Sequence, residues 1–253
     1  DGSGATFSAS AEVLSEYVVF NPGNVPEPEV VGKVENQNLH AVQVPDYLMI
    51  VPSQFTEQAE ELAELHREDG LDVLIVDPLR IYDEFSSGSR DITGLRDFAR
   101  MLYQRDPAKF KYLLLFGDGS YKNKDDKGTN VLPTYQSEKS EERTSSYVSD
   151  DFYALLDEDE SDSPQDLMDI GVGRFPVNTV SEASSVVRKI KEYMGKGDHP
   201  EAVFGNWKSR VVFVADDFDG DGTPTETEHT THSEVLAEMV EDSVNGHFIS
   251  RKK

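Results

Sequence analysis

Four acidic side chains near the end of the chain have the spacing of a calcium-binding loop. The run Asp217-Phe-Asp219-Gly-Asp221-Gly222 is followed by five residues and then Glu228, so that oxygen ligands at alternate positions can converge on one ion. An apolar run precedes this loop where a helix usually does, so a solvated acidic turn is the alternative. We expect Asp217, Asp219, Asp221 and Glu228 to bind Ca²⁺, and we expect no organic cofactor.

Two shorter clusters also suggest cation binding. His229 and His232 lie at helical i, i+3 spacing and could hold a transition metal, but the pattern favours the alternative, an exposed helix start. Asp150 and Asp151 form a like-charge pair that could bind a cation or perturb a pKa. A solvated turn is the alternative for this pair.

The glycine-rich stretch Gly117-Asp-Gly-Ser-Tyr121 follows an apolar run, as phosphate-binding loops do. It lacks the dinucleotide-binding spacing, the Walker lysine and the nucleophile-elbow serine. We therefore expect these glycines to let the chain turn away from a strand end.

Composition excludes several classes of chemistry. The chain has 253 residues and no cysteine, which rules out disulfides, thiolate metal sites and a cysteine nucleophile within it. Asp and Glu number 49 against 24 Lys and Arg, a net charge of -25, so nucleic acid is not an expected partner. No apolar run approaches the ~18 residues of a membrane-spanning helix.

Apolar runs alternate with helical patterns from residue 46 onward. This order predicts an α/β fold, a mainly parallel sheet with helices on both faces. The carboxyl ends of such strands form the usual ligand site, and here they carry Asp77, Asp118, Asp150, Asp151, Arg174, Asp216 and Asp217. The expected strands are 47–51, 71–76, 112–116, 170–175 and 210–215, and the expected helices are 54–67, 92–104, 180–194 and about 233–242.

Residues 1–45 read as a β and loop segment, the end of a preceding domain or a linker, and 46–253 as the α/β subdomain. Short apolar runs at 16–20 and 30–34 suggest strands in the first segment. The chain starts at Asp1 without a signal peptide, and it ends after a helix where another strand is expected. We expect a piece of a longer protein.

Several motifs occur together in a recognisable order. They are Gly32-Lys-Val-Glu-Asn-Gln-Asn-Leu-His40, Ile81-Tyr-Asp-Glu-Phe-Ser-Ser-Gly88, Leu113-Leu-Leu-Phe-Gly-Asp-Gly-Ser-Tyr121, Ser146-Tyr-Val-Ser-Asp-Asp-Phe-Tyr153, Asp169-Ile-Gly-Val-Gly-Arg-Phe-Pro176 and Val211-Val-Phe-Val-Ala-Asp-Asp217. In order and spacing the chain resembles the gingipain-type cysteine peptidases, in particular the sortase of the bacterial type IX secretion system.

The resemblance implies a caspase-like fold of two subdomains and a Cys–His peptidase at the outer membrane cell surface. Such an enzyme removes the C-terminal sorting domain from cargo proteins and works with other secretion-system subunits. Its catalytic His and Cys lie in the second subdomain, and none of this chain's histidines has the family's Gly-His-Gly setting. We therefore expect this chain alone to be inactive.

One catalytic position does carry over from the resemblance. The family has an acidic residue before the strand ending in Gly-Arg-Phe, and it orients the catalytic imidazole. Asp169 stands at that position here, with Asp in place of Glu. It would orient a histidine outside this chain, and a solvated aspartate at a strand start is the alternative.

Two other functions fit the acidic residues. One is a metal-dependent phosphoesterase or receiver-like module with Asp118, Asp151 and Asp217 around Mg²⁺. The other is a noncatalytic interaction domain stabilised by calcium.

Overall fold

The computed structural model describes residues 7–8, 16–27, 29–30, 32–120, 130–138, 141–142, 144–157, 166–215 and 226–243. The chain divides into two units, Asp1–Gln37 and Asn38–Lys253. In the described part of the first unit there is one 3₁₀ turn, Pro22–Asn24, and no strand. The strand expected at 16–20 is therefore wrong, and the described residues of 30–34 form no strand either. The division at residue 45 stays a prediction.

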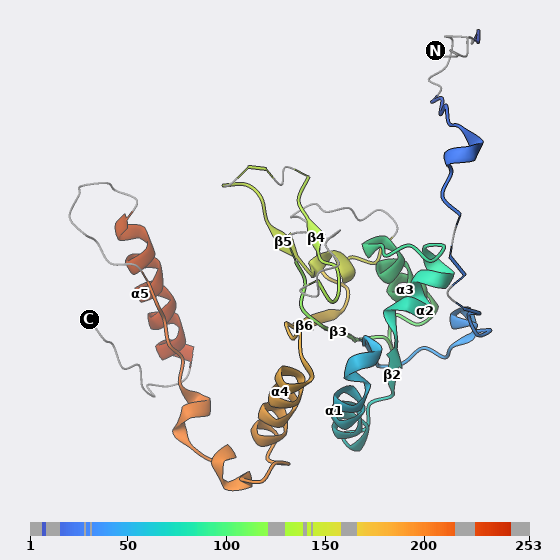
Figure 1. Cartoon of the computed structure of the whole chain (residues 1–253). Helices are drawn as coiled ribbons and strands as arrows, with labels where there is room; N and C mark the ends of the chain where they lie inside the picture. Colours follow the sequence, from blue (N-terminus) through green and yellow to red (C-terminus); the bar gives the residue numbers. More distant parts are fainter. Residues whose placement is uncertain are drawn as a thin grey trace. The chain divides into compact units, whose positions relative to one another are not determined.

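The second unit is built on four parallel strands (Figure 1). Their order is β2-β1-β3-β6, so β1 lies between the strand that follows it and the strand after that. Near-continuous apolar sequence suits strands that are covered on both faces. The strands are β1 (Tyr47–Ile50), β2 (Val73–Val76), β3 (Tyr112–Phe116) and β6 (Gly171–Phe175), which confirms four of the five predicted.

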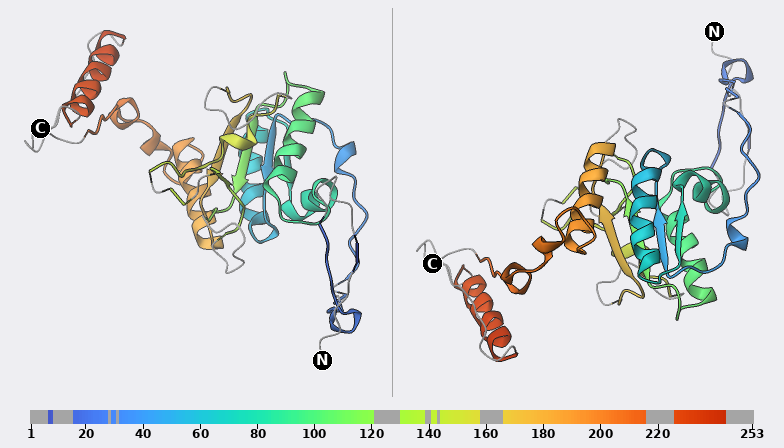
Figure 2. Two further views of the ribbon diagram at one scale, coloured as in Figure 1. Left: turned by 90° about the horizontal axis from the view of Figure 1, so that it is seen from above. Right: turned by 90° about the horizontal axis from the view of Figure 1, so that it is seen from below.

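Helices cover both faces of this sheet, as predicted. On one face α1 (Thr56–Glu68) and α4 (Val180–Tyr193) lie side by side (Figure 2) and pack against Met49 and Leu114. On the other face, α2 (Pro78–Phe85) and α3 (Ile92–Arg105) pack against strand side chains that point to that face, such as Leu48. Because side chains alternate along a strand, each face receives its own hydrophobic layer.

The helix α2 is not among the predicted helices. It begins with Asp77 accepting a hydrogen bond from the Leu79 amide at 2.8 Å, and Pro78 occupies its first turn. An aspartate cap followed by proline is a helix-start signal that the sequence does contain. The helix is short, and its buried positions are only Pro78, Ile81 and Tyr82, so no extended periodic pattern marks it.

Residues 210–215 form no strand, which corrects the fifth predicted strand. The side chains of Val212 and Val214 are 69% and 88% exposed. A β-branched run becomes a strand only where a neighbouring strand is available, and no strand among the described residues pairs with this segment. The following helix, α5, spans Glu226–Ser243 and starts earlier than predicted.

Between β3 and β6 the chain makes a long excursion at the strand ends. It includes a short antiparallel hairpin of β4 (Tyr135–Gln136) and β5 (Val148–Ser149), visible in Figure 1. The buried side chains of Leu132 and Tyr153 join the core on the α2 and α3 face. The excursion is therefore anchored to the sheet.

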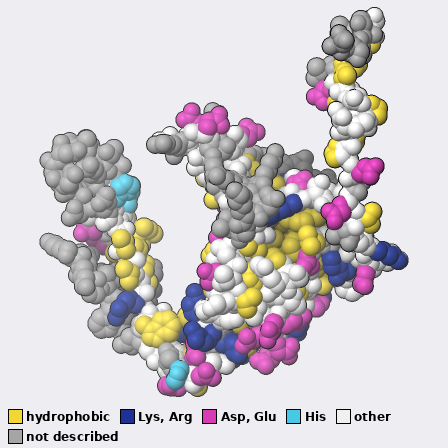
Figure 3. Space-filling model, in the orientation of Figure 1, with side chains coloured by type: hydrophobic (Ala, Val, Ile, Leu, Met, Phe, Trp, Pro, Cys, Tyr) yellow, Lys and Arg dark blue, Asp and Glu magenta, His cyan; other side chains and the backbone are white. Residues whose placement is uncertain are grey.

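The surface of the second unit is strongly acidic over α1. Exposed glutamates line this helix, and acidic side chains gather there in Figure 3. Lys191 contacts Glu61 at 2.5 Å and Lys196 contacts Asp69 at 2.8 Å, so the charge is partly neutralised. Among the helices of the described residues, none combines the length and apolarity needed to cross a bilayer.

Candidate functional site

The carboxyl ends of β3 and β6 meet around one arginine. The Arg174 guanidinium donates to both Asp150 carboxylate oxygens at 2.7 Å, through Nε and Nη2. Its remaining donors reach the carbonyl oxygens of Gly117 at 2.8 Å, Leu132 at 3.2 Å and Pro133 at 3.1 Å. One side chain thus ties β6, the end of β3 and the excursion together.

This ion pair is largely removed from solvent. The Arg174 and Asp150 side chains are 12% and 22% exposed. A two-point contact between guanidinium and carboxylate fixes orientation as well as distance. The predicted strand-end residues Arg174 and Asp150 therefore come together, and their contacts are structural.

Gly117 lets the chain leave β3 at this point, as the sequence predicted for the glycine-rich stretch. Its φ of 156° favours glycine. A Cβ on Gly117 would lie 2.6 Å from Val131 Cγ1, so the excursion packs directly on the backbone there.

Asp118 also lies at this edge of the sheet. Its Oδ2 accepts a hydrogen bond from the Asn178 side-chain amide at 2.9 Å. Asp151 is exposed and starts a 3₁₀ turn, and its backbone amide donates to the Ser149 hydroxyl. The Asp150–Asp151 pair is thus split, because Asp150 faces Arg174 while Asp151 faces solvent.

Asp169 lies just before the amino end of β6, so it is at the other end of the strands from Arg174. Its two carboxylate oxygens accept hydrogen bonds from the Tyr103 hydroxyl at 3.0 Å and the Leu156 amide at 2.8 Å. These contacts hold the end of the excursion against α3. The role of Asp169 in orienting a histidine stays a prediction.

The predicted calcium loop lies outside the described residues. This holds for Asp217, Asp219 and Asp221, and for the side chain of Glu228. Asp216 is outside them too. Within the described part of the chain, no group of three or more His, Asp or Glu side chains could hold a metal ion. The convergence of Asp118, Asp151 and Asp217 on Mg²⁺ therefore has no support from the described residues.

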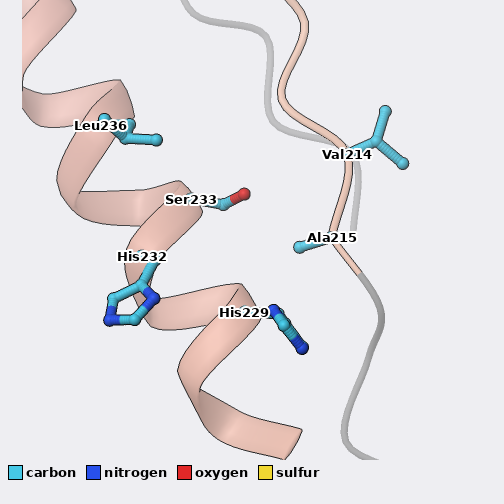
Figure 4. Close-up of a pocket in the computed structure, with 6 residues that line it drawn as sticks. All are labelled: Val214, Ala215, His229, His232, Ser233 and Leu236. Carbon is cyan, nitrogen blue, oxygen red and sulfur yellow. The ribbon is translucent and has the colours of Figure 1, made fainter. Parts of the chain in front are cut away.

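The histidine pair lines a pocket of about 470 Å³ beside α5. Figure 4 shows the His229 ring on the side facing Ala215, whereas the His232 ring points away from it. Both residues are exposed. In this arrangement the two imidazoles do not share one ligand position, which favours an exposed helix start.

Comparison with models of protein families shows to which family the chain belongs. A model of peptidase family C25, the gingipain family, matches residues 40–251. The chain belongs to this family. Comparison with curated proteins finds no match. The family resemblance seen in the sequence motifs is confirmed.

Solved structures support the same fold. Dimeric latent PorU from Porphyromonas gingivalis is similar with a TM-score of 0.58 and 33% identity, over 75% of this chain and 19% of that one. The Arg-specific cysteine proteinase gingipain R (RgpB) gives a TM-score of 0.50 at 12% identity, over 82% of this chain and 41% of that one. The second likeness concerns the fold alone. This chain spans about a fifth of the PorU chain.

Sequence reasoning missed two features of the strand-end region. Arg174 and Asp150 were both placed at strand ends, but their pairing across 24 residues was not foreseen. The helix α2, which begins directly after β2, was missed as well. The Asp77-Pro78 helix start is the signal that could have found it.

Proposed function

We propose that this chain is the leading α/β part of a PorU-like cysteine peptidase. The observation that carries the proposal is the 33% identity to PorU over 75% of this chain. In this role the chain supplies a scaffold and a substrate wall, while the nucleophile comes from residues beyond it. The absence of cysteine supports that division, since acyl transfer in this family needs a thiolate.

The substrates in this proposal are proteins. The parent enzyme acts as a sortase of the type IX secretion system, cleaving the C-terminal sorting domain from cargo at the outer membrane surface. The acidic surface of net charge -25 suits contact with basic protein patches and is unsuited to nucleic acid. Asp169 is proposed to orient the catalytic histidine from the neighbouring subdomain.

The excursion after β3 is the proposed substrate wall. It stands at the carboxyl ends of β3 and β6, which is where parallel sheets present their ligand sites. The Arg174–Asp150 pair and three backbone carbonyls fix its base. This anchored base is the part of the excursion that we propose lies beside an extended peptide.

The test compares the 253-residue chain with the protein encoded by its complete reading frame. We expect the frame to encode Gly-His-Gly and then a cysteine beyond Lys253. The longer protein should cleave a cargo C-terminal domain and lose that activity with iodoacetamide, whereas this chain alone should cleave nothing. Iodoacetamide-insensitive cleavage by the chain alone would sink the proposal, and so would a reading frame without cysteine.

A further inference from the structure

Two exposed aromatic side chains meet at the end of α4. Tyr193, the last residue of this helix, is 56% exposed, and Trp207, in the 3₁₀ turn Asn206–Ser209, is 48% exposed. Their rings lie edge to face, with centroids 5.7 Å apart. Hydrophobic and basic side chains lie next to one another in this region (Figure 3). Large aromatic surface is therefore open to solvent here.

The ammonium group of Lys208 lies over both rings. Its Nζ is 4.2 Å from the centroid of Tyr193 and 5.6 Å from that of Trp207, and it donates to the Tyr193 carbonyl at 3.0 Å. No carboxylate among the described residues forms an ion pair with Lys208. An ammonium group has three N–H donors, so two of them remain for a ligand.

The position of the Trp207 ring is fixed by bare backbone. A Cβ on Gly205 would lie 2.9 Å from Trp207 Cδ1, so the indole packs directly on the glycine. The Tyr193 ring contacts the indole from the helix. A ligand would therefore meet rings that are already ordered, which lowers the entropy cost of binding.

The segment around these rings differs in charge from the rest of the chain. Residues 186–210 contain six Lys or Arg and three Asp or Glu, a net charge of +3, so the remaining residues carry -28 of the total of -25. Lys189 is exposed, lies one helical turn before Tyr193, and has no carboxylate partner among the described residues. Lys189, Tyr193, Trp207 and Lys208 together form an aromatic–basic patch.

Other lysines nearby are already neutralised. Lys191 contacts Glu61 at 2.5 Å, and Lys196 contacts Glu68 at 3.2 Å and Asp69 at 2.8 Å. The positive charge of the aromatic–basic patch is uncompensated by comparison, although the chain has twice as many acidic as basic residues. Charge complementarity therefore indicates an acidic partner for this patch.

The size of the acidic partner follows from the charge elsewhere. Duplex DNA, with one charge per ~1.7 Å of its axis, or an anionic lipid surface would also face the acidic remainder of the chain and be repelled. A short peptide segment carries only a few charges and can remain within the patch. An aromatic side chain on that segment would pack against the exposed rings.

We propose that the aromatic–basic patch docks an acidic polypeptide segment of a partner protein. An aromatic side chain of the segment packs on Trp207 and Tyr193, and carboxylates on either side of it pair with Lys208 and Lys189. Docking involves no cleavage, so the experiment below can succeed or fail independently of the proposed peptidase function.

Trp207 is the only tryptophan in the 253 residues, so its fluorescence reports directly on the patch. The probe is the capped peptide acetyl-Glu-Glu-Phe-Glu-Glu-amide, and its titration should change the fluorescence saturably. Raising the salt from about 20 to about 500 mM should weaken binding because it screens exposed charges. The same peptide with Gln in place of Glu should bind about tenfold more weakly, since it forms no ion pairs.

Two lysine variants and one control locate the binding. Lys208→Gln and Lys189→Gln should each weaken binding by about threefold to fivefold, because each removes one exposed ion pair. Lys111→Gln is the matched control, since Lys111 is also exposed, donates to a backbone carbonyl, that of Pro107, and has no carboxylate partner among the described residues. It should leave the affinity unchanged. Circular dichroism verifies that each variant is folded.

Several results would overturn the proposal. They are the absence of saturation by about 10 mM acidic peptide, equal affinities for the Glu and Gln peptides, and equal effects of Lys208→Gln and Lys111→Gln. Tighter binding of phosphatidylglycerol vesicles or of an oligothymidine of eight nucleotides, at the same concentration of negative charge, would overturn it as well. Either outcome would identify a lipid surface or a nucleic acid as the partner.

Discussion

The Arg174 guanidinium donates two hydrogen bonds to the Asp150 carboxylate, with Nε and Nη2 each 2.7 Å from an oxygen. Removing one partner of a fully buried pair costs about 3–5 kcal/mol because the other charge is left unpaired. Here the two side chains keep 12% and 22% exposure, so Asp150→Asn should lower the free energy of unfolding by about 2–3 kcal/mol. Urea unfolding measures this change.

The exposed pair of Lys109 and Asp72 is the matched control. The Lys109 Nζ and Asp72 Oδ2 atoms are 2.8 Å apart, a similar distance, but the side chains are 36% and 56% exposed. Asp72→Asn should therefore change the free energy of unfolding by less than about 1 kcal/mol. If both variants lose the same stability, the burial argument for Arg174 and Asp150 is wrong.

Asp169 offers a test that separates a structural from a catalytic role. The two Asp169 oxygens accept from the Tyr103 hydroxyl and the Leu156 amide, and Asp169→Asn leaves only one acceptor oxygen. The variant should lower the free energy of unfolding by about 1–2 kcal/mol. In the parent peptidase it should also lower kcat and change the pH profile, because an amide cannot stabilise an imidazolium as a carboxylate does.

Tyr103→Phe is the control for Asp169. It removes the same hydrogen bond from the other side and should leave kcat nearly unchanged. The measurement is kcat against pH for the two variants at a temperature where both are folded. Equal losses of kcat would show that Asp169 acts only through packing of the excursion on α3.

The sequence predicted the four strands of the sheet well because short apolar runs mark buried strands clearly. The strands at 47–51 and 112–116 are short apolar runs bounded by polar residues, and burial on both faces demands that composition. Residues 210–215 have the same composition but form no strand, since β structure depends on a neighbour that local sequence cannot supply.

The site was less predictable for a different reason. Strand-end residues can be read from the sequence, but which of them meet depends on how a long excursion folds back. Arg174 reaches Asp150 across 24 residues, and its carbonyl partner Gly117 lies 57 residues away. Contacts at that range depend on topology, which periodicity does not encode.

Glu84 should give the protein a measurable acid sensitivity. Its two carboxylate oxygens accept from the Leu39 amide at 2.8 and 2.9 Å, and one also contacts His40 Nδ1 at 2.9 Å. Burial acts to raise the pKa of Glu84, but the hydrogen bonds from Leu39 and His40 outweigh it and lower the pKa below 4.5. Leu39 is buried in the core, so this contact anchors the start of the second unit.

The direction of the pH dependence of stability follows from the lowered pKa of Glu84. A carboxylate whose pKa is lower in the folded than in the unfolded state stabilises the fold above the unfolded pKa, and this stabilisation is lost as pH falls through the folded pKa. Glu84→Gln should therefore melt roughly a few degrees lower than wild type at pH 7, with the difference shrinking below pH 4.5. Thermal melts between about pH 3 and 7 check this. A constant difference, or the same trend in the exposed control Glu238→Gln, would refute it.

Calcium binding by Asp217, Asp219, Asp221 and Glu228 is the remaining prediction. Like charges about 4 Å apart repel by on the order of a few kcal/mol at an effective dielectric near 20, before salt and water screen them. A bound Ca²⁺ reverses that repulsion, and binding to the folded state alone raises stability by mass action. The melting midpoint should rise with millimolar Ca²⁺ and fall with EDTA, while Mg²⁺ should substitute poorly because it resists dehydration.

Asp219→Ala tests whether this loop is responsible. It removes one central ligand and should abolish most of the calcium-dependent shift, whereas Asp162→Ala, in a different acidic stretch without the ligand spacing, should keep it. Comparing the two variants separates a specific site from the general screening of a chain with net charge -25. An unchanged midpoint in wild type, or equal shifts in both variants, would show that the acidic residues from 217 to 228 bind no calcium specifically.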